Sequence, residues 1–92
     1  MKENSSQYES EDLKELLKQY QNLRAGYNHS FIDEESFEKI IDYFDDVEEL
    51  PQALEAADLG VEQYPYSSGL LLKKADLMIA TRRYSDALRI LE

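Results

Sequence analysis

Apolar residues recur along this chain at the three- and four-residue spacings that are typical of amphipathic helices. The first third of the chain carries one such set: Leu13, Leu16, Leu17, Tyr20 and Leu23. Gly26 follows where a helix C-cap belongs, so we predict a first helix over residues 10–26. Residues 1–9 are polar and lack a sustained period, and we expect them to form a disordered lead-in.

A second helix is predicted from residue 34 to about residue 45. Asp33 suits an N-cap, and Ile32 with Phe37 has the spacing of a hydrophobic staple. The apolar side of this helix comprises Phe37, Ile40, Ile41 and Phe44. We expect this side to face the core.

Three further helices are predicted after a short turn at residues 46–47. The first spans about residues 48–64, because Pro51 fits the opening turn of a helix and Pro65 blocks its continuation. The next begins at a cap on Ser67 or Ser68. Its expected apolar positions are Leu71, Leu72, Ala75, Met78 and Ile79. A turn is predicted at residues 82–83, and a fifth helix begins near residue 84.

Two parts of the chain match each other when one is shifted by 34 residues. The matched pairs are Phe37 and Leu71, Ile41 and Ala75, Asp42 and Asp76, Phe44 and Met78, Leu50 and Tyr84, Ala53 and Ala87, and Leu54 and Leu88. A fixed period of this length is typical of helix-turn-helix solenoids, whose units bury their apolar faces against one another. The period therefore favours a non-catalytic binding scaffold.

The residues that hold this period resemble those of the tetratricopeptide repeat (TPR) family. The family's apolar and aromatic positions are matched by Phe37, Ile40, Phe44, Leu71, Tyr84 and Leu91, its small positions by Ala53, Gly60, Ala75 and Ala87, and its terminal proline by Pro65. Ile41 and Lys74 depart from the pattern. The resemblance implies an all-α, right-handed solenoid of antiparallel helix pairs: a capping helix and loop over 10–33, one repeat over 34–67 and a truncated repeat over 68–92. We therefore expect this chain to be the N-terminal part of a longer repeat protein.

The resemblance also implies a binding groove, because the first helix of each TPR unit lines the concave side. The family's groove positions fall on Glu35, Glu38, Asp42, Asp45 and Asp46 in the first unit, and on Gly69, Leu72, Asp76, Ile79 and Ala80 in the second. The expected groove is acidic at one end and apolar at the other. It suits a protein or peptide partner with a basic segment, although a solvated, solubilising acidic face without a partner is the simpler interpretation.

The charge distribution narrows the choice of partner. The chain has 20 acidic and 10 basic residues, and residues 33–58 alone hold eleven acids against one base, Lys39. Nucleic acids and anionic membrane surfaces require basic residues, so neither is expected as a partner. The N-terminus lacks the apolar core of a signal peptide, and we expect a cytoplasmic protein.

Nothing in the sequence predicts an enzyme, a cofactor or a metal site. The chain has no cysteine, its single histidine is His29 in a loop, and no glycine-rich phosphate loop or nucleophile elbow is present. Asp42 and Asp45 with Glu48 or Glu49 offer at most a loose calcium site, because no EF-hand loop accompanies them.

Two other functions remain open at this stage. The segment could be a structural cap of a longer array whose groove lies downstream, or an N-terminal extension of a multidomain enzyme or regulator. We also expect self-association through apolar surface near the end of the second unit, where Leu88 and Leu91 lie close to Leu72 or Met78.

Overall fold

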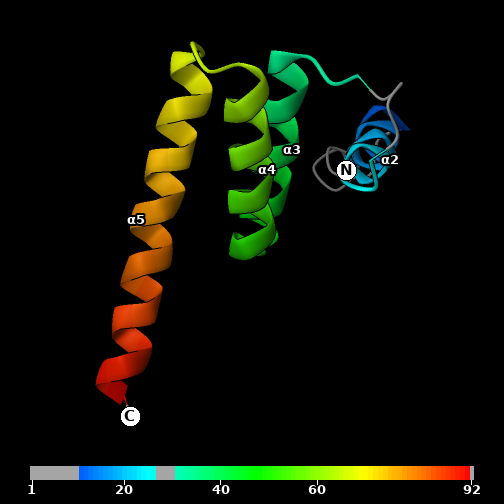
Figure 1. Cartoon of the computed structure of the whole chain (residues 1–92). Helices are drawn as coiled ribbons and strands as arrows, with labels where there is room; N and C mark the ends of the chain where they lie inside the picture. The colour runs from blue at the N-terminus through cyan, green and yellow to red at the C-terminus, as the bar shows by residue number, and fades with distance from the viewer. Residues whose placement is uncertain (1–10, 27–30, 92) are drawn as a thin grey trace, which may run out of the picture.

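The structure, a computed structural model, describes residues 11–26 and 31–91, and these residues form four helices and no strand. The helices are α2 (Glu11–Arg24), α3 (Glu34–Asp46), α4 (Leu50–Gln63) and α5 (Ser68–Leu91). Three of them stand side by side, with α4 antiparallel to both α3 and α5, whereas α2 is seen nearly end-on beside α3 (Figure 1). The predicted lead-in over 1–9 and His29 lie outside the described residues.

The start of α3 agrees with the sequence prediction. The Asp33 side chain accepts a hydrogen bond of 2.8 Å from the backbone N–H of Ser36, as an N-cap should. This bond lowers the pKa of the Asp33 carboxyl below its ordinary value. Ile32 and Phe37, the two residues of the predicted staple, are both buried in the core.

Helix α3 ends in a Schellman motif, which forms the turn between α3 and α4. The N–H of Glu49 bonds to the carbonyl of Phe44 at 2.8 Å, and the N–H of Glu48 bonds to that of Asp45 at 3.0 Å. Glu48 has a φ of 61°, the left-handed angle that this motif requires and that usually selects glycine. Pro51 then lies in the first turn of α4, as predicted.

Hydrogen bonds hold both ends of the connection between α4 and α5. The hydroxyl of Tyr64 donates a 2.8 Å hydrogen bond to the carbonyl of Ile32, which fixes the end of α4 to the start of α3. The N–H of Leu70 donates to the hydroxyl of Ser67, which is therefore the cap of α5. Gly60 permits close packing here, because an added Cβ would lie 3.2–3.3 Å from Phe37 and Leu70.

The predicted turn at residues 82–83 and the predicted fifth helix are wrong. Helix α5 continues without a break from Ser68 to Leu91, so the second unit does not form a helix pair. A comparison 34 residues apart explains the difference, because Arg82 replaces the left-handed Glu48 and Ser85 replaces Pro51. No glycine or proline occurs between Ala80 and Leu91, so no residue there stops the helix.

The apolar side predicted for the helix after Ser68 is also wrong. Among the α5 residues whose burial the structure describes, Leu70 and Leu77 are buried against the rest of the molecule. The predicted residues are exposed instead: Leu71, Leu72, Ala75, Met78 and Ile79. This helix carries two apolar sides, and the 34-residue match selected the one that lies away from α3 and α4. Leu88 continues the inner side but is 49% exposed, because α5 is much longer than α3 and α4.

The core lies where α3 and α4 meet, and α2 covers its edge. Phe37, Ile40, Ile41, Ala53, Ala56, Ala57 and Leu70 are all at most 2% exposed. Helix α2 contributes Tyr20, whose ring lies 6.0 Å from that of Phe44. Arg24 of α2 also forms an ion pair of 3.1 Å with Glu55 of α4. Beyond α2, Gly26 follows with a left-handed φ of 90°, which fits the predicted C-cap.

Candidate protein-binding groove

Helices α3 and α5 run parallel, because each is antiparallel to α4, and they contact each other with a constant offset of 31 residues. The carboxylate of Glu38 lies so close to Gly69 that a Cβ there would be 2.6 Å from its Oε2. One turn further, Asp42 Oδ1 accepts a hydrogen bond of 2.8 Å from Lys73 Nζ. Asp45 and Asp76, another 31-residue pair, border the same hollow. The two helices therefore form the walls of a groove.

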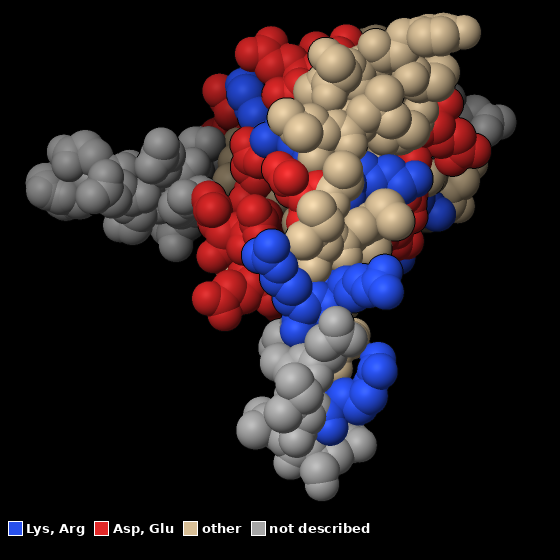
Figure 2. All heavy atoms as spheres, turned by 90° about the vertical axis from the view of Figure 1, so that its left-hand side faces the viewer, with Lys and Arg blue, Asp and Glu red and all other residues tan. Residues whose placement is uncertain are grey.

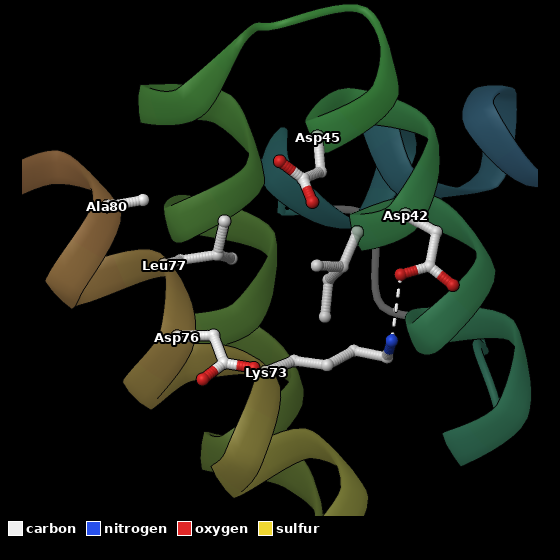
Figure 3. A pocket seen from close by; sticks show the side chains of 7 residues that line it. Asp42, Asp45, Lys73, Asp76, Leu77 and Ala80 are labelled. Atoms are coloured by element: carbon white, nitrogen blue, oxygen red, sulfur yellow. Dashed lines mark hydrogen bonds and ion pairs between the residues drawn. The ribbon is translucent and has the colours of Figure 1, made fainter.

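Towards the C-terminal end of α3, this groove opens into a hollow of about 280 Å³. Its lining residues are Ile41, Asp42, Asp45, Lys73, Asp76, Leu77 and Ala80. Figure 3 shows the Asp45 carboxylate above the gap between the helices, with Lys73 reaching across it to Asp42. Ile41 and Leu77 are buried and provide an apolar floor. The hollow thus combines an apolar base with a charged rim.

The rim of the hollow carries an excess of negative charge. Three carboxylates, on Asp42, Asp45 and Asp76, surround one ammonium group, that of Lys73. Lys73 forms its ion pair with Asp42, whereas Asp45 and Asp76 have no ion pair or hydrogen bond of their side chains within residues 11–26 and 31–91. Their side chains are solvent-exposed, so the charges are hydrated but not neutralised by the protein.

Lys74 holds α5 from the opposite side. Its ammonium group lies 3.1 Å from Asp58 of α4, so two adjacent lysines of α5 pair with two different helices. Each pair is partly exposed and contributes little to stability, on the order of 0–1 kcal/mol. They add to the burial of Leu70 and Leu77, which places one side of α5 against α3 and α4.

The structure brings together only some of the predicted groove residues. Asp42, Asp45 and Asp76 line the hollow, and Glu38 lies against Gly69, nearer the N-terminal ends of α3 and α5. Glu35 and Asp46 are exposed on α3 but do not line the hollow, and Leu72 and Ile79 lie on the outer side of α5. Ala80 was predicted by its repeat position and does line the hollow.

Sequence reasoning missed three of the lining residues: Ile41, Lys73 and Leu77. Ile41 and Leu77 were hard to find because a helix wheel alone does not distinguish the floor of a groove from the core. Lys73 did leave a signal. Lys73 lies 31 residues after Asp42, which is three residues fewer than the 34-residue period. Such a pair forms when the two parallel helices are shifted along their axes by three residues from the repeat alignment.

The carboxylates of the groove are spread along two helices instead of converging on one point. Within the described residues, no group of three or more Asp, Glu or His side chains is close enough to hold a metal ion. The arrangement is suited to contact a cationic surface instead.

Comparison with protein-family models, curated proteins and solved structures found no match for this chain. Among the described residues, no helix is long and apolar enough to cross a membrane. The groove is therefore interpreted from its own geometry and charge.

Proposed function

We propose that this chain is a non-catalytic protein-binding module, and that the groove between α3 and α5 receives a basic segment of a partner protein. The observation that carries this proposal is the hollow lined by Asp42, Asp45 and Asp76, in which Lys73 is the one basic side chain. Two of these carboxylates have no protein counterion within the described residues. An incoming lysine or arginine would supply it.

The shape of the hollow suits such a side chain. Lysine and arginine have an aliphatic stem and a charged head, and they bury the stem on apolar surface while the head stays at a polar rim. Ile41, Leu77 and Ala80 offer the apolar surface, and Asp45 and Asp76 offer the rim. A volume of about 280 Å³ accommodates one long side chain, not a whole folded element.

The resemblance of the first unit's sequence to a tetratricopeptide repeat supports the proposal. Helices α3 and α4 form the antiparallel pair expected of one repeat, and the first helix of each unit, α3 and the start of α5, lines the groove. A TPR-like adaptor in the cytoplasm, continued by further repeats, remains our proposal for the native protein.

The test uses a fluorescent peptide of alternating lysine and alanine, and a matched glutamine–alanine peptide. We expect the lysine peptide to bind and the glutamine peptide not to bind. Binding should weaken as salt rises from 0.01 M to 0.1 M, because the Debye length falls from about 30 Å to about 10 Å. Amide chemical shifts should change at Asp45, Asp76 and Ala80.

Variants then distinguish the groove from general acidity. The double variant Asp45→Asn, Asp76→Asn should lose at least about tenfold in affinity, since each charge-assisted hydrogen bond contributes about 1.5–3 kcal/mol before screening. The control, Asp12→Asn with Glu62→Gln, removes the same charge from exposed positions on α2 and α4. Equal loss in both double variants would show that binding is nonspecific attraction to an acidic chain and would refute the groove.

A further inference from the structure

A stripe of apolar side chains covers the side of α5 that faces away from α3 and α4. Leu71, Leu72, Met78 and Ile79 are 44%, 64%, 53% and 51% exposed, and Ala75 lies exposed among them. Between residues 71 and 79, no charged residue of the helix projects onto this side. Figure 2, which looks at the α5 side of the molecule, shows a band of uncharged residues with acidic residues beside it and basic residues gathered at its lower end.

We propose that this stripe is a dimer interface that pairs α5 with α5 of a second copy in antiparallel orientation. The positions of the stripe are symmetric about Ala75, at four and three residues before it and three and four residues after it. An antiparallel copy centred at the same residue therefore presents the same stripe. Leu71 would face Ile79 of the second copy, and Leu72 would face its Met78. This self-complementarity is what a two-fold interface requires.

The small residue at the centre allows the helices to approach closely. Packed helix axes lie about 8–10 Å apart, and the Cα atoms lie about 2.3 Å from each axis. The two Ala75 Cα atoms at the symmetry axis would therefore be separated by about 3.5–5.5 Å. A larger residue there would hold the four flanking side chains out of contact.

The charge distribution favours α5 over the other helices as the contact between copies. Helix α5 has five basic and two acidic residues, whereas α3 has one basic and six acidic residues. Pairing through α5 keeps the two acidic α3 helices on the outside of the dimer. Each copy carries a net charge of -10, so rising salt should strengthen the dimer by screening their repulsion. Peptide binding in the groove has the opposite salt dependence.

Other occupants of the stripe make different predictions. The 34-residue match places Tyr84, Ala87 and Leu88 where α4 has residues that cover α3, so residues 84–91 could fold back over the stripe. That arrangement would interrupt α5 and give a monomer. In the continuous helix, these residues cannot reach the stripe of their own chain. The stripe consists of five side chains, whereas a standard stable interface involves about 20–30 residues on each side. We therefore expect a weak, concentration-dependent dimer.

The absence of cysteine from the chain permits a direct test. Ala75→Cys places one thiol of each copy at the symmetry axis, where the expected Cα separation of about 3.5–5.5 Å overlaps the 4.4–6.8 Å range of disulfides. With glutathione disulfide as the oxidant, this variant should form a covalent dimer about tenfold faster than Ser85→Cys, because pairing raises the effective thiol concentration. Ser85, which is also exposed and lies on the same helix, is the control.

The orientation is tested by mixing Leu72→Cys with Met78→Cys. In the antiparallel register the mixture should form mixed disulfide faster than either variant alone forms its own dimer. Faster self-linking of Leu72→Cys would overturn the antiparallel pairing. Equal rates for Ala75→Cys and Ser85→Cys, with monomeric sedimentation of the unmodified protein at millimolar concentration, would overturn the dimer itself and leave an intramolecular cover.

A second variant tests dimerisation independently of peptide binding in the groove. Leu72→Gln with Ile79→Gln retains good helix formers and removes two of the larger apolar side chains of the stripe. Because both residues are exposed, thermal stability of the dilute protein should be unchanged while dimerisation is lost. The Asp45→Asn, Asp76→Asn variant should dimerise like the unmodified protein, so either proposal can fail without the other.

Discussion

At the scale of single residues, Glu48 is held in a backbone conformation that its side chain does not favour. Its φ of 61° places the Cβ close to the following carbonyl, which costs an L-residue roughly 1–2 kcal/mol. The Schellman hydrogen bonds of Glu48 and Glu49 maintain the turn despite this strain. The side chain also adds a negative charge at the C-terminal end of α3, where the helix dipole already disfavours anions.

We predict that Glu48→Gly stabilises the protein. Glycine relieves the strain, and its larger loss of backbone entropy offsets part of the gain, so the net increase in unfolding free energy should be about 0.5–1 kcal/mol. For a chain of this size, that corresponds to a rise of about 2–8 °C in melting temperature. Thermal melts followed by circular dichroism measure it. Glu49→Gly should be destabilising instead, because Glu49 has an ordinary φ of -103°.

Tyr20 gives a second prediction at this scale, because its buried hydroxyl has no hydrogen-bond partner in the described part of the chain. Burial, followed by the charge of Glu55, raises its pKa from 10.0 to about 12. The folded pKa lies above the unfolded one. Ionisation of Tyr20 therefore does not affect the free energy of unfolding below pH 10, and it lowers that free energy as the pH rises from 10 towards 12.

Tyr20→Phe should accordingly be neutral or stabilising at pH 7, by up to about 1 kcal/mol, because it removes an unsatisfied polar group. Its advantage over the unmodified protein should widen by about 1–2 kcal/mol between pH 9 and pH 11.5. Urea unfolding at pH 7, 9 and 11.5 provides the comparison. Tyr66→Phe, at a residue that is 96% exposed, should show no such widening. If the difference between Tyr20→Phe and the unmodified protein did not change with pH, the hydroxyl would not be titrating as a buried group.

At the scale of elements, the sequence predicted the first helices well because each has local stop and start signals. Asp33, Pro51 and Pro65 mark boundaries that depend on a few neighbouring residues, and all three agree with the structure. The conformation of the segment after Thr81 was predicted from the repeat match instead, without such local signals. The repeat match implied a turn there, but the turn chemistry of the first unit is missing from residues 82–85.

The groove was predictable to a similar extent. Asp42, Asp45 and Asp76 followed from the repeat positions, because those positions lie on the sides of α3 and α5 that meet. Leu72 and Ile79 did not belong to it. The sequence could not show how far α5 is rotated about its axis, which is set by the burial of Leu70 and Leu77 and by the ion pairs of Lys73 and Lys74.

The missing turn chemistry leads to a third prediction. Arg82→Gly with Ser85→Pro introduces a residue that tolerates the left-handed angle and a proline at the position equivalent to Pro51. Proline inside a helix costs about 3 kcal/mol or more, so α5 should break near residue 82 and helical circular dichroism at 222 nm should fall. The melting temperature should change little, because this part of α5 runs past the ends of α3 and α4 (Figure 1). Arg82→Ala with Ser85→Ala is the control and should keep the helix intact.

At the scale of the whole molecule, repulsion among acidic residues opposes folding. Helix α3 places Glu34, Glu35, Glu38, Asp42, Asp45 and Asp46 within four turns. Like charges three or four residues apart destabilise a helix by about 0.2–0.5 kcal/mol per pair. The three ion pairs that link different helices in the described part of the chain are exposed, and they are too weak to compensate for a net charge of -10.

We therefore predict that salt stabilises this fold. Between 0.01 M and 0.1 M sodium chloride the melting temperature of dilute protein should rise by a few degrees, because screening weakens the repulsion more than it weakens the ion pairs. Asp45→Asn should raise the melting temperature at low salt and reduce its salt dependence. It removes a carboxylate near the C-terminal end of α3, where the helix dipole disfavours negative charge. A melting temperature that falls with salt would show that the ion pairs dominate.

The overhang of α5 has a consequence for the lifetime of the protein among proteases. Arg82, Arg83 and Arg89 lie on exposed helix, beyond the packing that holds Leu70 and Leu77. Local unwinding there disturbs little of the core, so it needs far less free energy than global unfolding. An arginine-specific protease should therefore trim α5 before it cuts elsewhere in the described residues. The stump that ends near residue 82 would keep the groove, so cleavage would shorten the molecule without removing its candidate binding site.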